Sequence, residues 1–458
     1  MIDDSFLLLT PLARRLYHEY ACHLPLIDYH NHLSIAEIAV DRRFPDLTEL
    51  WLQSDPYKHR AMRICGVEER RITGDADPYD KFLAWCTIFP SLIGNPLYHW
   101  SILELKRFLD IDWPINAETA DKIWHLAQEK LSDPAFSAQS LLRRFNVAYT
   151  APCTAISADL SPFAACPVAA PSLRGDDLLP LSADGIARLA AGTGSAVDSL
   201  GGLAEVLEKR LDDFHAAGCR FADHALDHDF RYVADDGCNE ARFQKLLCGG
   251  VTDAADMLAL SAAVLRLLGA AYARRGWVMQ LHIGALRNTS SRLRRVAGQA
   301  GGFAGIGSFS PEGLTAFLDD LEQGPAGLPR TVLFTINPAD NAVLSVLSGS
   351  FCQDGVRAKV QQGPAWWWCD HLTGMREHFE CISAFGVLST FIGMTTDSRC
   401  FPSLVRHEYF RRALCGWLGD KAQRGELPDS TDDLAGLVRA VCYGNAQAIL
   451  TGANTSTF

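Results

Sequence analysis

The chain lacks the features that mark several common classes of protein. None of its 14 cysteines falls in a C-x-x-C pair, and the closest two, Cys238 and Cys248, are ten positions apart, so a structural zinc module is not indicated. No G-x-G-x-x-G follows a predicted strand and no G-x-x-x-x-G-K-[ST] occurs, which leaves a dinucleotide fold and a phosphate-binding loop without support. No linker, repeat or low-complexity segment divides the 458 residues.

Positive charge is also scarce. The chain has 42 Lys and Arg residues against 54 Asp and Glu residues, which gives a formal net charge of −12. Such a field repels phosphate backbones and anionic lipid, so neither a nucleic-acid partner nor a membrane partner is expected. An anionic substrate would have to be met by a local cluster of arginine or lysine side chains.

Targeting and membrane-spanning segments are not apparent either. Asp3 and Asp4 stand where a signal peptide would carry basic residues, and the apolar run at 6–9 is too short for its hydrophobic region. The longest apolar stretch, 257–273, is interrupted by Arg266 and falls short of the ~20 residues of a membrane span. Free cysteines within apolar patterns are typical of a reducing compartment, and we expect a cytoplasmic protein.

Short β-rich runs alternate with helical patterns along most of the chain. We predict strands at 24–29, 146–151, 168–173, 220–225, 277–283, 330–336, 357–361 and 388–396. Eight strand-then-helix units are the number found in a (β/α)8 TIM barrel, so we predict an α/β barrel that spans 1–458 as a single domain. The stretch 35–145 shows no strand alternation and is predicted to be a helical insertion after the first strand. A doubly wound open sheet is the alternative architecture.

Chemically active side chains fall at the predicted carboxyl ends of the strands, where barrel enzymes place their catalytic groups. The first strand runs into His30 and His32, the fifth into His282, and the eighth into Asp397. Two histidines at i and i+2 on an extended segment point to the same side, which is what binding one divalent ion requires. The eighth strand would close on the first, so we predict a mononuclear zinc-type site of His30, His32 and Asp397, with His282 as a further ligand.

Each of these signals is weak alone. An H-x-H pair is often two unrelated polar residues, and Asp-Ser-Arg at 397–399 could be a helix cap with a surface arginine. His224, at the end of the fourth strand, is interpreted as a hydrogen-bonded core or rim histidine. The run Trp366, Trp367 and Trp368 is interpreted as barrel packing, with one indole available to stack on a ligand. The joint occurrence of His, His, His and Asp at strand ends strengthens the prediction of a site.

Longer motifs accompany these strand ends. They are DYHNHLS at 28–34, AMR at 61–63, NPLYHW at 95–100, QLHIGALRN at 280–288, TDSR at 396–399 and RHEYFRR at 406–412. Together they resemble the glucuronate (uronate) isomerase family of the amidohydrolase superfamily, over nearly the whole chain. The resemblance implies a barrel enzyme of hexuronate breakdown that interconverts D-glucuronate with D-fructuronate, and D-galacturonate with D-tagaturonate.

The same resemblance implies roles for individual residues. Metal-site roles would fall on His30, His32 and Asp397 with His282 close by, and substrate roles on Tyr57, Arg174 and Arg399. A divalent metal, zinc being the favoured ion, and a small-molecule hexuronate would then be the only partners expected, with self-association into a homo-oligomer left open.

The chemistry of an aldose-to-ketose isomerisation fits these residue types. Moving a proton from C2 to C1 needs a base near C2, electrophiles on O1 and O2 to stabilise an enediol, and a clamp on the remote carboxylate. Asp397 or the Tyr57 oxygen is the candidate base, and the metal, His30 and Tyr57 can polarise the oxygens. Arg399 and Arg174 can supply bidentate pairing to the carboxylate. The competing interpretation of Arg399 is an ion pair with a neighbour such as Glu408.

The alternative function is a mononuclear metal-dependent hydrolase of the same superfamily, in which the metal would activate water. A binuclear hydrolase usually needs a lysine at the end of the fourth strand to carry a bridging carbamate, and 220–227 contains none. The identity of the metal, its role in the reaction and the preferred hexuronate all stay open at this stage.

Overall fold

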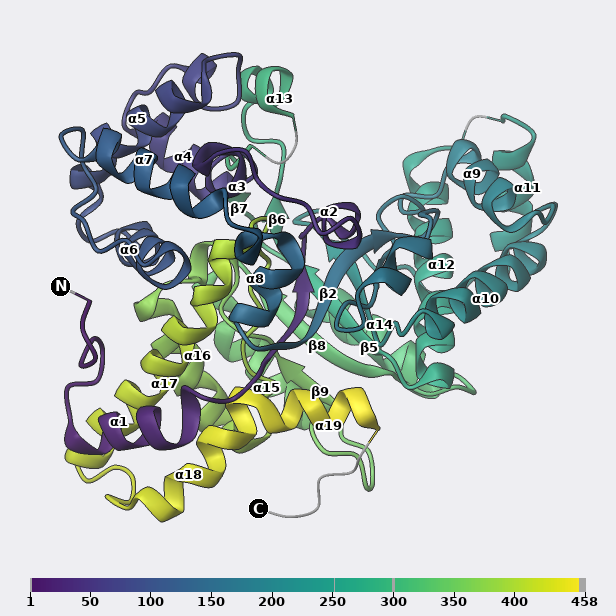
Figure 1. Cartoon of the computed structure of the whole chain (residues 1–458). Helices are drawn as coiled ribbons and strands as arrows, with labels where there is room; N and C mark the ends of the chain where they lie inside the picture. The colour runs from purple at the N-terminus through teal and green to yellow at the C-terminus, as the bar shows by residue number, and fades with distance from the viewer. Residues whose placement is uncertain (1, 251, 299–300, 453–458) are drawn as a thin grey trace.

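Seven parallel strands form one curled sheet in the order β1-β2-β3-β4-β5-β8-β9 (Figure 1). The computed structural model describes residues 2–250, 252–298 and 301–452. The strands are β1 (Leu26–Asn31), β2 (Val147–Ala155), β3 (Ser172–Arg174), β4 (Phe221–Leu226), β5 (Val278–Ile283), β8 (Arg330–Thr335) and β9 (Val360–Gln362). Each overlaps one of the first seven predicted runs. Because every pairing in this sheet is parallel, all carboxyl ends lie at one edge.

The predicted eighth strand at 388–396 is wrong as a regular strand. The segment begins as a 3-10 helix, η8 (Leu388–Thr390), and residues 391–398 form no regular strand. Gly393 has φ +87°, outside the β region, and a Cβ there would lie 2.1 Å from the carbonyl oxygen of Val441. Only glycine fits this turn, and the turn interrupts the ladder.

The segment still closes the barrel on β1, through both backbone and side chains. Asp397 N donates to His30 O (3.0 Å) and His32 N donates to Ser398 O (2.7 Å). The buried Asp28 carboxylate accepts hydrogen bonds from Thr396 N (2.7 Å) and Thr396 Oγ1 (2.8 Å). The side chain of Asp28 on β1 therefore takes the place of some of the ladder bonds that a regular eighth strand would have made.

Helices cover the outside of the sheet. They are α1 (Pro11–Arg15), α9 (Ala183–Thr193), α10 (Leu200–Ala216), α11 (Asn239–Leu247), α12 (Ala254–Arg275), α14 (Pro311–Gln323), α15 (Asn341–Ser350), α16 (Leu372–Phe385), α17 (Arg406–Gln423), α18 (Thr431–Arg439) and α19 (Asn445–Thr451). Helix α14 begins at Pro311, and Ser310 caps it because Ser310 Oγ accepts from Gly313 N.

One helix among the described residues, α12, is long and apolar enough to cross a membrane by length and composition alone. In the structure it packs against α10, α11, α14 and β5, and Leu260, Val264 and Leu268 on its inner face are fully buried. Arg266, which interrupts the apolar run, donates to Tyr232 Oη (3.0 Å). Its apolar surface is thus accounted for by core packing.

The stretch between β1 and β2 is helical throughout, and no strand occurs in residues 32–146, all of which are described. Its helices are α2 (Ile35–Ala39), α3 (Leu47–Trp51), α4 (Pro56–Ile64), α5 (Pro78–Ile88), α6 (Pro96–Leu109), α7 (Ala120–Leu131) and α8 (Ala138–Arg144). Figure 1 shows α3, α4, α5 and α7 grouped together with α13 (Ser291–Ala297) beside them.

A short antiparallel ribbon, which the sequence did not predict, connects this helical group to the barrel. It pairs β6 (Ala285–Leu286), directly after β5, with β7 (Gly305–Ile306). Gly302, just before β7, is in contact with α4: its φ is +74° and a Cβ there would lie 2.1 Å from Pro56 O. The ribbon thereby fixes α4 relative to the strand ends.

Candidate active site

Strand β1 presents His30 and His32 at the carboxyl edge of the sheet. The strand is buried along its whole length, and His30 N is held by Thr395 Oγ1 (2.8 Å). The Nε2 atoms of His30 and His32 lie 3.3 Å and 3.1 Å from the same atom, Oδ1 of Asp397. The structure therefore brings the three predicted metal-site residues together around one carboxylate oxygen.

The other oxygen of Asp397 is held by two indoles. Trp366 Nε1 and Trp367 Nε1 each donate to Asp397 Oδ2 at 2.8 Å. Burial alone would raise the pKa of Asp397, but the hydrogen bonds and charges of His30 and His32 outweigh it and hold the pKa well below its usual range. From sequence, these tryptophans were assigned to barrel packing, with one indole available to stack on a ligand, and not to a hydrogen bond with Asp397. Three adjacent indole N–H donors near a catalytic strand end were the signal that could have suggested more.

A second layer of polar side chains lies beneath His30. Asp223 of β4 is fully buried, and its Oδ2 accepts from Arg174 Nη1 (3.0 Å) and lies 3.6 Å from His282 Nδ1. The ring of His282 stacks on Trp366 with the centroids 4.6 Å apart. Burial raises the pKa of Asp223 to about 7, and burial lowers the pKa of His282 well below its usual value. The sequence placed Asp223 at a strand end but assigned it no role.

Cys153, near the carboxyl end of β2, is a further residue that sequence reasoning did not assign. Its Sγ lies 3.4 Å from His30 Nδ1 and 3.6 Å from Asp223 Oδ1. Burial opposes ionisation of this thiol, but the neighbouring charges of His30 and His32 hold its pKa well below the usual value. No spacing in the sequence connects Cys153 to the H-x-H pair, because only strand pairing brings them together.

Tyr57 reaches this site from the helical stretch between β1 and β2. It lies in the first turn of α4, which Asp55 caps by accepting from Tyr57 N (2.9 Å) and Lys58 N (3.1 Å). Its hydroxyl is buried and has no hydrogen-bond partner among the described residues. Burial and then the charge of Asp397 raise the pKa of Tyr57 well above its usual value, so it stays protonated at neutral pH.

A cavity of about 470 Å³ opens over these groups. Its walls carry His32, Tyr57, Cys153, Arg174, Asp176, Arg287, Trp367, Trp368, Asp397 and Arg399. This volume suits a small polar molecule. Of the residues predicted to act on substrate or metal, His30 and His282 lie just behind the wall, and the others line it.

The three arginines of this wall differ in what they already bind. Arg174 donates through three of its nitrogens to Asp176 and Asp223, and Arg287 Nε donates to Asp227 (2.9 Å). Arg399 makes no ion pair or guanidinium hydrogen bond with the described part of the chain.

The alternative partner suggested for Arg399 is occupied elsewhere. Glu408 accepts from Arg107 Nε (2.9 Å) and from Arg412 Nε (2.9 Å). The guanidinium of Arg399 is therefore the one on this wall that is free, within the described residues, to bind an anionic ligand.

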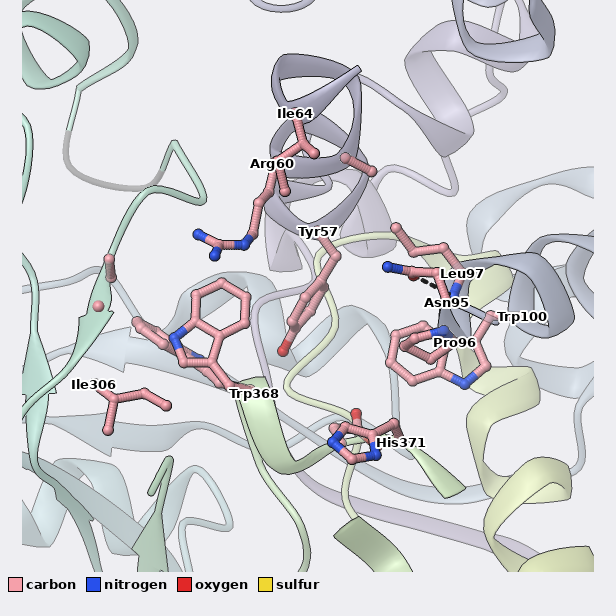
Figure 2. Close-up of a pocket in the computed structure, with 15 residues that line it drawn as sticks. Tyr57, Arg60, Ile64, Asn95, Pro96, Leu97, Trp100, Ile306, Trp368 and His371 are labelled. Atoms are coloured by element: carbon pink, nitrogen blue, oxygen red, sulfur yellow. Dashed lines mark hydrogen bonds between the residues drawn. The ribbon is translucent and has the colours of Figure 1, made fainter. Parts of the chain in front are cut away.

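A second cavity of about 520 Å³ lies behind Tyr57 and shares Tyr57, Ala304, Trp367 and Trp368 with the first. Figure 2 shows Tyr57 extending from α4 between Trp368 and Trp100. Its ring meets both indoles edge to face, with centroids 6.1 Å and 6.0 Å apart. Arg60 lies over the Trp368 ring at 4.5 Å. These aromatic contacts hold Tyr57 in place between the two cavities.

His224 is a buried structural residue, as interpreted from the sequence. Its Nε2 lies 2.9 Å from Tyr272 Oη, and its ring faces the backbone of Gly175, where a Cβ would lie 2.5 Å away. Burial lowers the pKa of His224 to about 4. It supports the turn that follows Arg174 and does not line the cavity.

Two groups of side chains in the described residues could hold a metal ion. His30, His32 and Cys153 form the first, and His30, Asp223 and His282 form the second, each with all its ligand atoms within 4.8 Å of one another. Imidazole and thiolate donors with one carboxylate suit Zn²⁺. The first group faces the cavity and therefore fits an ion that also meets a substrate.

Comparisons with known proteins agree with this geometry. A family model described as glucuronate isomerase matches residues 1–450. A protein of Salmonella newport named uronate isomerase is 41% identical over 464 residues, covering 98% of this chain and 99% of its own length. The structure of a uronate isomerase from Thermotoga maritima superposes with a TM-score of 0.91 at 29% identity, covering 98% of this chain and 99% of that one. A glucuronate isomerase from Caulobacter crescentus has the same fold, with a TM-score of 0.88 at 22% identity and coverage of 98% and 97%.

Proposed function

The chain belongs to the glucuronate isomerase family, and we propose that it interconverts D-glucuronate with D-fructuronate, and D-galacturonate with D-tagaturonate. The reaction is an aldose-ketose isomerisation through an enediol. The proposal rests on one observation. The cavity of about 470 Å³ is lined by Asp397, by Tyr57, whose hydroxyl has no partner among the described residues, and by Arg399, whose guanidinium is free within them. These are the groups that the reaction needs at its two ends.

Asp397 is assigned as the base. The carboxylate lines the cavity and, with its pKa held well below the usual range, is ionised at neutral pH and can accept a proton. The indole N–H groups of Trp366 and Trp367 fix Oδ2, so the carboxylate is oriented before the substrate arrives. The proton removed from C2 is then delivered to C1, and the O2 proton moves to O1, so that the aldehyde becomes a hydroxyl group and C2 becomes the ketone.

Tyr57 is assigned as a hydrogen-bond donor to a substrate oxygen. A hydroxyl that stays protonated can stabilise the negative charge that develops on O1 or O2. Because it has no partner among the described residues, no existing hydrogen bond has to break first. His30, whose Nε2 lies 3.3 Å from Asp397 Oδ1 just behind the cavity wall, is assigned to polarise the second oxygen.

Arg399 is assigned as the clamp on the remote carboxylate, and Arg174 as a second basic group on the same wall. The free fork of Arg399 can pair with a carboxylate in bidentate fashion. Arg174 already holds Asp223 and Asp176, so its main contribution is to keep that part of the wall rigid and to offset the charge of the two carboxylates.

A divalent ion, which we take to be zinc, would be held by His30, His32 and Asp397 with His282 close by, and when bound would supply a Lewis acid for the substrate oxygens. We place the enzyme in the cytoplasm, in hexuronate catabolism. A free thiol at the site and free cysteines throughout the described chain are compatible with a reducing compartment.

The test is an assay of the purified protein with glucuronate and with galacturonate, in which the ketose product is identified by NMR. Formation of fructuronate and tagaturonate supports the proposal. An enzyme that left both sugars unchanged while it hydrolysed a lactone or an amide would instead be the mononuclear hydrolase.

A further inference from the structure

Cys153 is brought to the H-x-H pair by strand register. β2 pairs in parallel with β1, with Pro152 opposite Asn31, and with β3, with Cys153 opposite Ser172. Cys153 therefore sits one residue beyond the partner of Asn31, at the level where β1 presents His30 and His32.

The distances around Cys153 are those of ligands that share one ion. With bond lengths of about 2.3 Å to sulfur and about 2.05 Å to nitrogen or oxygen, a tetrahedral ion places S and N about 3.6 Å apart and N and O about 3.4 Å apart. Cys153 Sγ lies 3.9 Å from His30 Nε2, the nitrogen that also faces Asp397, and one ligand atom each of His30, His32 and Cys153 lie within 4.8 Å of one another. Asp397 Oδ1 lies 3.3 Å and 3.1 Å from the two Nε2 atoms.

We propose that the Cys153 thiolate is a direct ligand of the divalent ion, together with His30, His32 and Asp397. The inference rests on the metal site of the proposed function and adds a ligand to it. On binding, the thiol proton leaves to solvent as the sulfur-metal bond forms. A sulfur ligand would make the site selective for Zn²⁺ over Mg²⁺ or Mn²⁺, because thiolate is a soft donor.

The competing interpretation is a thiol that only donates a hydrogen bond to Asp223. That bond, 3.6 Å from Cys153 Sγ to Asp223 Oδ1, is weak because a thiol is a weak hydrogen-bond donor. Asp223 is moreover already held by Arg174. Cys153 also differs from the core thiols of the chain, such as Cys86 and Cys415, because it lines the cavity and they are enclosed in apolar packing.

The test is to remove metal from the full chain, reload it with Co²⁺ without substrate, and record the near-ultraviolet spectrum. Wild type should show a thiolate-to-cobalt charge-transfer band, which Cys153→Ser should lose. The matched control, Cys352→Ser, changes an exposed thiol outside the cavity and should keep the band. Competition with a chelator should show Zn²⁺ affinity reduced on the order of a hundredfold in Cys153→Ser and unchanged in Cys352→Ser.

X-ray absorption of zinc-loaded wild type gives an answer that does not depend on how a variant folds, and it should show one sulfur neighbour at about 2.3 Å. Cobalt bound without a charge-transfer band, a band that persists in Cys153→Ser, or zinc with only nitrogen and oxygen neighbours would each overturn the assignment. Isomerisation by wild type is measured separately, so failure of the ligand assignment leaves the proposed function standing.

Discussion

Trp366 Nε1 lies 2.8 Å from Asp397 Oδ2, and this hydrogen bond links an aromatic run on one barrel segment to the carboxylate on the next. The same indole stacks on His282 with a 4.6 Å separation. One side chain thus fixes both the orientation of the proposed base and the position of the buried histidine behind it.

Replacing Trp366 with Phe should lower kcat/KM for glucuronate by roughly tenfold to a hundredfold. The ring contact with His282 is retained, while a hydrogen bond to a charged group, worth roughly 1.5 to 3 kcal/mol, is lost. Steady-state kinetics measure the effect. Trp113→Phe, which changes a partly exposed indole that lies outside the cavity wall, is the control and should leave kcat/KM unchanged. Equal activity in all three proteins would mean that the indole does not position Asp397.

Tyr57→Phe should separate activity from stability. The Tyr57 hydroxyl is buried without a partner among the described residues, so its removal should leave the free energy of unfolding unchanged or slightly raised. The value of kcat should fall by on the order of a hundredfold or more, because the substrate oxygen loses the hydrogen bond that the Tyr57 hydroxyl donates to it. Denaturant unfolding and kinetics of the same sample give both numbers. Tyr79→Phe, on α5, is the control, and a Tyr57 variant that lost stability and activity together would indicate a structural role.

Arg399→Met should lower kcat/KM for glucuronate by on the order of a hundredfold or more. A bidentate pair with the substrate carboxylate should reach the upper part of the roughly 1.5 to 3 kcal/mol range for charged hydrogen bonds. Arg399→Lys should recover only part of the activity, because an ammonium group cannot reproduce the planar fork.

The control for Arg399 is a neutral analogue in which an alcohol replaces the carboxylate. Its weak turnover should be nearly the same in wild type and Arg399→Met. If the variant lost activity equally on both substrates, Arg399 would be maintaining the site and not binding the carboxylate.

Replacing both His30 and His32 with Ala should abolish bound metal, as measured by elemental analysis after purification. The two imidazoles converge on Asp397 Oδ1, so their loss removes two of the four proposed ligands and leaves only Asp397 and Cys153. His125→Ala, which removes an exposed histidine on α7 that pairs with Asp121, should retain the metal. Unchanged metal content in the double variant would contradict the site.

Buried His378 should make the fold less stable as the pH falls from about 6.5 to about 4. Burial lowers the pKa of His378 to about 4 in the folded chain, whereas an unfolded histidine titrates near ~6.5. Between these values the unfolded chain binds the additional proton, so unfolding is favoured, by up to roughly 3 kcal/mol at the acid end. Above pH ~6.5 this histidine contributes no pH dependence.

Denaturant unfolding at several pH values measures this effect. His378→Gln should flatten the stability curve between pH 4 and pH 6.5, approximately, relative to wild type. Buried His224 has the same sign of shift, so part of the wild-type slope should persist in His378→Gln.

Much of the barrel could be predicted from local pattern. Each regular barrel strand overlaps a predicted run, because short β-rich runs between turn residues depend on neighbours in sequence. The eighth strand could not be predicted correctly. Residues 391–398 are apolar enough for a strand, but the glycine turn at 393 and the side-chain bonds from Asp28 become apparent only when the segment lies against β1.

The predicted site residues divide in the same way. His30 and His32 could be paired from sequence, since residues two apart on an extended segment point to one side. Sequence could not predict that the Arg174 guanidinium is paired with carboxylates while that of Arg399 is not. This depends on where Asp223, Asp176 and Glu408 lie in space. The catalytic roles of these residues stay predictions until the variants are measured.

The sequence by itself determined the strand and helix pattern, the acidic charge, and which strand ends carry chemically active side chains, because each of these depends on residue type and short spacing. Tertiary structure alone decided which of those side chains meet. Three contacts join segments far apart in the chain: Cys153 lies against His30, Trp366 donates a hydrogen bond to Asp397, and Tyr57 lines the cavity beside them. Such contacts arise from strand register and barrel closure, which local sequence does not encode.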